Sequence, residues 1–144
     1  MQHLISHDER TLRAPSDARE LLLAFDPSRL DVPQAVRRAA GLWASHWMEA
    51  EPDALILMAC NARARNREAA SRSLRLRRLA AELERQGVPR DRIRYTTRGT
   101  PTPACVQAGE RGVAWIKVLQ PHQLETGVRP IESLFADPSV DAST

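Results

Sequence analysis

Arginines gather in one stretch of the chain, where they could bind an anionic group. The loop and helix predicted over residues 61–86 carry, in order, Arg63, Arg65, Arg67, Arg72, Arg75, Arg77, Arg78 and Arg85. A guanidinium can hold a carboxylate through two parallel hydrogen bonds, so a ligand with carboxylates matches this stretch best. An acidic protein surface or a nucleic-acid backbone would also fit the charge. The sequence argues against nucleic acid, because no aromatic residue interleaves with these arginines to stack on bases.

The residues that most often perform catalysis or bind metals are scattered. His46 and His122 stand alone, and His3 and His7 lie in a polar segment without helical periodicity. No serine, cysteine and histidine are arranged as a nucleophile with its base. We therefore predict that the chain is not an enzyme and that it holds neither a metal nor a cofactor.

Two cysteines, Cys60 and Cys105, are too few for a disulfide scaffold or a zinc cluster. Cys60 ends a predicted strand and Cys105 follows another, so both could lie near the margins of a sheet. They could form a disulfide in an oxidising compartment. Two separate free thiols are the alternative.

Apolar periodicity predicts strands alternating with helices. The unbroken apolar runs 21–25 and 54–60 are typical of strands covered on both faces. Residues 33–48 and 66–86 carry apolar residues at helical spacing, and shorter strands are expected at 92–97 and 111–119. This strand–helix–strand–helix–strand–strand order (βαβαββ) predicts an α/β (α+β) two-layer sandwich. It would have a mixed sheet with two long helices on one face. The tryptophans are expected in the core: Trp43, Trp47 and Trp115.

Four short segments occur in an order that is typical of a known family. They are Phe25-Asp26-Pro27-Ser28, Gly87-Val88-Pro89, Gly99-Thr100-Pro101-Thr102-Pro103 and Glu110-Arg111-Gly112-Val113. Together they resemble the C-terminal domain of outer membrane protein A, the OmpA-like family of peptidoglycan-binding modules. The resemblance covers residues 20–119. It makes residues 1–19 an N-terminal extension and residues 120–144 a C-terminal extension, mobile at its end.

The resemblance implies a site for the diaminopimelate residue of the cell-wall peptide. Counted back from Gly87, Arg75 falls at the position of the family's ligand-binding arginine. Asn61 and Asn66 could serve a neutral version of the site, although both residue types also cap loops. Arg111 is the further candidate, at the start of the last strand. A solvated helix surface is the alternative for Arg75.

One departure from the family weakens this site. The family carries an acid in a Gly-x-Thr-Asp segment after the second strand, where this chain reads Ala59-Cys60-Asn61-Ala62. The ammonium group of the ligand would then lose its water without meeting an anion. We therefore predict a non-catalytic cell-envelope module that binds peptidoglycan peptide weakly through Arg75. The alternative is a degenerate copy of the fold that serves as a protein–protein scaffold in a secretion, pilus or motor complex.

Composition places few further bounds on function. Lys and Arg exceed Asp and Glu by 21 to 18, an excess too small to indicate nucleic acid. No run approaches the ~18 apolar residues of a membrane helix. The N-terminus lacks the basic start and apolar middle of a signal peptide. We expect a periplasmic or envelope-associated protein whose leader is not in this chain, with a cytoplasmic protein as the alternative.

Overall fold

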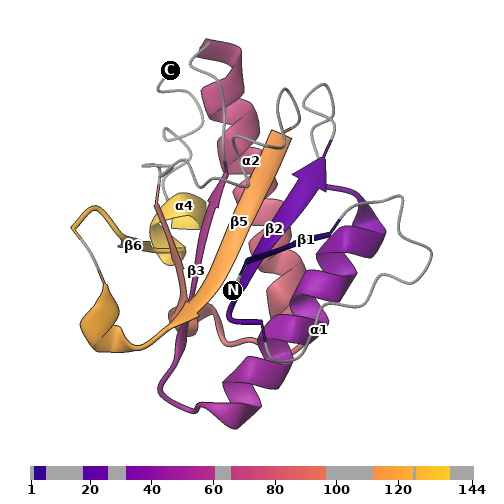
Figure 1. Cartoon of the computed structure of the whole chain (residues 1–144). Coiled ribbons are helices and arrows are strands. Elements are labelled where there is room, and N and C mark those ends of the chain that lie inside the picture. The colour runs from indigo at the N-terminus through magenta and orange to yellow at the C-terminus, as the bar shows by residue number, and fades with distance from the viewer. Residues whose placement is uncertain are drawn as a thin grey trace.

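The computed structural model describes residues 2–5, 18–25, 32–60, 66–96, 112–124 and 126–136. Figure 1 shows the order of its elements along the chain. They are β1 (Gln2–Ile5), β2 (Glu20–Phe25), α1 (Gln34–Ala50), β3 (Leu55–Cys60), α2 (Asn66–Arg85), η1 (Arg90–Arg92), β4 (Ile93–Tyr95), β5 (Gly112–Leu119), η2 (Pro121–Gln123), β6 (Arg129–Pro130) and α4 (Glu132–Ala136).

The strands form one mixed sheet in the order β1-β2-β5-β3-β4-β6. β5 is antiparallel to both of its neighbours, β2 and β3, while β3 and β4 are parallel. Each of the two long helices connects strands that run in the same direction, as a crossover between parallel strands requires. The predicted two-layer α/β sandwich with a mixed sheet is therefore confirmed.

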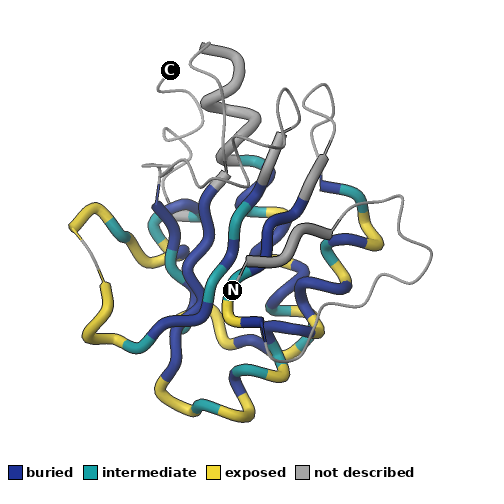
Figure 2. Tube along the Cα trace, in the orientation of Figure 1, coloured by how far each residue is buried: buried dark blue, intermediate teal, exposed yellow. Residues whose placement is uncertain are grey.

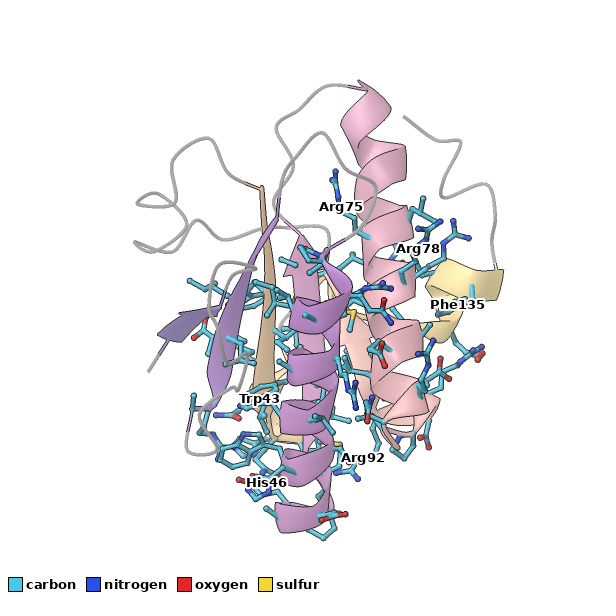
Figure 3. All side chains as sticks on the ribbon, turned by 90° about the vertical axis from the view of Figure 1, so that its right-hand side faces the viewer. Trp43, His46, Arg75, Arg78, Arg92 and Phe135 are labelled. Carbon is cyan, nitrogen blue, oxygen red and sulfur yellow. The ribbon has the colours of Figure 1, made fainter. Side chains whose placement is uncertain are left out.

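Both long helices cover the same face of the sheet. Figure 3 shows α1, α2 and α4 together on one side of the strands. The main core lies between the layers, where alternate residues of the strands meet the apolar stripes of the helices. Figure 2 shows this burial along the strands and the inner sides of the helices. Leu76, Leu79 and Leu83 of α2 are fully buried there, as their spacing predicts.

Two glycines determine how α2 ends and how it meets α1. Gly87 has a φ of 103°, a conformation that favours glycine, and follows the last turn of α2. The Val88 N–H donates to the Leu83 carbonyl at 3.0 Å, which closes the helix in a Schellman motif. Gly41 lies where α1 approaches α2, because a Cβ there would come within 3.3 Å of the Glu82 carbonyl oxygen.

Described parts of both predicted extensions pack on this sandwich. β1 pairs with β2 at one edge of the sheet, and β6 pairs with β4 at the other. Ile131 and Leu134 are buried in the main core, so the short helix α4 docks as its apolar residues suggest. Arg90 also attaches α4, because its guanidinium lies 4.5 Å from the centre of the Phe135 ring. The domain boundaries at residues 20 and 119 stay a prediction, and so does the mobility of the C-terminal end, which lies outside the described residues.

No helix in the described part of the chain is long and apolar enough to cross a membrane.

Leu79→Ala should lower the free energy of unfolding by about 2–5 kcal/mol, because it removes buried methyl groups and leaves a cavity between α2 and the sheet. The matched control is Leu42→Ala on α1, whose side chain is 55% exposed. That change should stay within about 0.5 kcal/mol. Urea unfolding of the three proteins measures both effects. Equal effects of the two substitutions would contradict the placement of α2.

Candidate functional site

Three strands end at one edge of the sheet, which is where a ligand site is expected. β2, β3 and β4 run in the same direction and end at Phe25, Cys60 and Tyr95. The register aligns these ends, since Phe25 lies opposite Gly112 and Cys60 opposite Ala114. In open α/β sheets, ligands bind beyond the carboxyl ends of the strands. We call this edge the strand-end edge.

Arg75 lies on α2, on the first half of the helix, and is only 4% exposed. Figure 3 shows its side chain directed toward the N-terminal end of α2 and away from α4. Since α2 starts directly after the loop that follows β3, this is the direction of the strand-end edge. A buried guanidinium is rare without a partner, and Arg75 does have a partner within the chain. Arg75 is therefore not the solvated surface arginine that was the alternative interpretation.

The structure places few of the other predicted site residues. Asn61, Arg111 and Cys105 lie outside the described residues. Asn66 begins α2 and Cys60 ends β3, but their side chains are not among those described. The neutral version of the ligand site and the Cys60–Cys105 disulfide therefore stay predictions. Arg75 is the one predicted ligand residue whose side chain is placed.

A buried acid on α2 was missed by the sequence reasoning. Glu82 is 4% exposed, and its carboxylate accepts a hydrogen bond from Gln86 Nε2 at 3.2 Å. Seven residues separate it from Arg75, which puts both on the same side of α2, about 10 Å apart along the axis. The only signal in the sequence was its place beside Leu83 on the edge of the apolar stripe. The Glu82 carboxyl group thus pairs with Gln86 and Arg85 near the end of α2, at a distance from Arg75.

An ion pair holds together the end of the sandwich opposite the strand-end edge, and we call this the closed end. Arg19 holds the Glu51 carboxylate through two hydrogen bonds, of 2.6 Å and 3.1 Å, and its guanidinium lies over the Trp47 ring. Gln120 donates to the same carboxylate. These contacts join the start of β2, the end of α1 and the end of β5. The Arg19 hydrogen bond lowers the pKa of Glu51, and the same bond raises the pKa of Arg19.

Backbone carbonyl groups at this closed end are also satisfied within the chain. Arg92 donates to the carbonyl oxygens of Ala54, at 2.9 Å, and Glu51, at 2.8 Å. The indole N–H groups of Trp43 and Trp47 both donate to the Ala18 carbonyl. The tryptophan and arginine side chains at this end therefore serve the fold, which leaves the strand-end edge as the better candidate for a ligand.

The described residues include no group of three histidines, cysteines or acids that could hold a metal ion. His46 is exposed on α1 with its ring edge toward Trp47, and His122 is exposed on η2. Neither histidine therefore belongs to a group of three candidate ligands in the part of the chain that the structure describes.

Comparison of the chain with protein-family models, curated proteins and solved structures finds no match. What the structure itself defines is a class: a two-layer α/β sandwich with a buried arginine directed toward the carboxyl ends of its parallel strands.

Glu51→Gln should destabilise the protein at neutral pH and make its stability depend less on pH in the acid range. The folded state lowers the pKa of Glu51 below its ordinary value of 4.5, so the ion pair stabilises the fold above that pH. This stability is lost as the pH falls through the lowered pKa. Urea midpoints of wild type and variant should therefore differ at neutral pH and converge in acid.

The control for this prediction is Glu49→Gln, an exposed carboxylate two residues earlier on α1 that has no ion pair among the described residues. It should change the midpoint little at either pH. A Glu51→Gln midpoint equal to that of wild type at neutral pH would contradict the stabilising role of the ion pair.

Proposed function

We propose that this chain is a non-catalytic cell-envelope module of the OmpA-like kind, and that it binds peptidoglycan peptide weakly at the strand-end edge. The observation that carries the proposal is the buried guanidinium of Arg75, directed toward the edge where β2, β3 and β4 end. On this proposal the protein works in the periplasm or attached to the envelope, with a cytoplasmic location as the alternative.

The order of the elements supports the proposal. From Glu20 to Leu119 the chain runs strand, helix, strand, helix, strand, strand, which is the order on which the resemblance rests. α2 ends at Arg85, two residues before Gly87, the glycine from which the position of Arg75 is counted. The helix between these two points is continuous, so the count is not disturbed by a break.

The chemistry of the site predicts weak binding. One guanidinium can hold a carboxylate of the cell-wall peptide through two hydrogen bonds. The segment after β3 offers no acid for the ammonium group of diaminopimelate. Arg75 also has a partner within the chain, which the ligand carboxylate must replace. Affinity should therefore be low, and it should fall as salt screens the charge.

Isothermal titration with a diaminopimelate-containing peptide tests the proposal. Arg75→Ala should weaken binding roughly tenfold or more, since a hydrogen bond to a charged group contributes about 1.5–3 kcal/mol. Binding by the wild type should fall as salt rises beyond physiological strength, where the Debye length is about 8 Å. Asn61→Asp or Cys60→Asp should strengthen binding, because either supplies the missing anion.

Two further variants control this experiment. Arg85→Ala removes an arginine at the far end of α2 whose side chain is 72% exposed, and it should leave binding unchanged. Arg75→Lys keeps the charge without the bidentate geometry, so it separates loss of recognition from loss of folding. If neither acid improves binding and Arg75→Ala changes nothing in a folded protein, the cell-wall proposal fails.

The second candidate is a degenerate copy of the fold that acts as a protein–protein scaffold in a secretion, pilus or motor complex. The burial of Arg75 favours it, since a guanidinium that is 4% exposed and partnered within the chain can be a structural residue. Arg75→Ala would then lower stability without any effect on peptide binding. Thermal melting measured beside the titration separates the two candidates.

A further inference from the structure

The face of the sheet without helices has an apolar centre. In Figure 1, α2 lies behind β5, so that view looks onto this helix-free face. Its buried residues are Leu22, Leu55, Leu57, Ala59 and Leu119. Strands open to water on one face usually alternate apolar and polar residues. No described helix covers this face, and Trp115 and Val128 pack against Leu55, Leu57 and Leu119 there.

Charged residues form a row across the middle of this face. The register places Glu20 of β2 opposite Lys117 of β5, and Lys117 opposite Leu57 of β3. Leu57 in turn lies opposite Arg94 of β4. Across the sheet the row therefore reads negative, positive, neutral, positive. The next row along the strands is apolar, with Trp115 between Leu22 and Ala59.

The side chains of the row are partly exposed. The Lys117 ammonium lies 4.7 Å from the centre of the Trp115 ring, and the Trp115 N–H donates to the Glu20 carboxylate. Arg94 donates to the carbonyl groups of Asp91 and Ile93. Within the described residues, neither Lys117 nor Arg94 has a carboxylate partner. The face thus combines a buried apolar centre with two partly exposed cations that form no ion pair within the described residues.

We propose that the helix-free face is the contact between two copies of this chain, related by a twofold axis parallel to the strands. Rotation about that axis reverses the order of the row in the second copy. Glu20 of one copy then faces Arg94 of the other, and Lys117 faces Leu57. When the row is reversed in the second copy, each charged residue therefore faces either an opposite charge or a neutral residue. An isologous interface requires this self-complementarity, because the same surface of both copies takes part in it.

The charges also select this axis over the other simple choice. A twofold axis across the strands would place Glu20 opposite Glu20 and Lys117 opposite Lys117, and like charges at an interface cost several kcal/mol. The selected axis keeps the strands of the two sheets roughly aligned, as in sheets that pack face to face. Trp115 and Arg94 belong to the residue types that contribute most at protein interfaces. This proposal does not depend on peptidoglycan binding, because it concerns the helix-free face of the sheet and not the strand-end edge.

Sedimentation velocity of single and mixed variants tests the pairing. Wild type should dimerise in a concentration-dependent way. Glu20→Arg and Arg94→Glu should each weaken the dimer at least about tenfold, because each places like charges together twice per dimer. A mixture of the two variants should associate again, since both contacts in the mixed dimer join Arg to Glu. Arg38→Glu, an exposed position on α1, is the control and should dimerise like wild type.

Circular dichroism checks that each variant is folded. If Glu20→Arg does not fold, Glu20→Gln replaces it, because the amide keeps an acceptor for the Trp115 N–H and should still weaken the dimer. A wild type that stays monomeric up to about 1 mM overturns the proposal. Folded single variants that dimerise like wild type, or a mixture that stays monomeric, overturn it as well. A wild-type monomer that binds an acidic protein through Lys117 would assign the face to a different partner.

Discussion

The antiparallel insertion of β5 between β2 and β3 is the constraint on which the structure depends. It joins residues 112–119 to residues 20–25 on one side and to residues 55–60 on the other. The paired residues are far apart in sequence, so the contacts of β5 are non-local and slow to form during folding. The same pairing aligns the ends of β2 and β3 at the strand-end edge. Successive side chains of β5 point to opposite faces of the sheet, so Ile116 lies in the main core and Lys117 on the helix-free face.

The two ends of the sandwich differ because their polar groups are used differently. At the closed end, Glu51 is held by Arg19 and Gln120, and Arg92 satisfies backbone carbonyl groups. At the other end, Arg75 is directed toward the edge where three strands stop. Arg75 thus has the place expected of a ligand residue and the burial expected of a structural one. The proposed weak binding of a carboxylate ligand is consistent with both properties, and a purely structural role for Arg75 is the alternative.

Most of the sandwich could be predicted because its signals are local. The spacing of Leu76, Leu79 and Leu83 predicted α2 and its buried face, and Gly87 predicted its end. β1 and β6 could not be predicted, since short strands at sheet edges are defined by pairing with distant partners. The same holds for the burial of Arg75 and Glu82, which depends on what packs against α2. Trp115 was expected in the core, but the register places it on the helix-free face.

The location of the ligand site can be measured directly by amide chemical shifts. A ¹⁵N-labelled sample titrated with a diaminopimelate-containing peptide should show its largest shifts at Arg75 and at the strand-end edge, including Thr96 and Ala114. The amides around Glu51 and Arg92 at the closed end should not move. Shifts concentrated at the closed end, or no shift with peptide up to about 1 mM, would contradict a cell-wall ligand at Arg75.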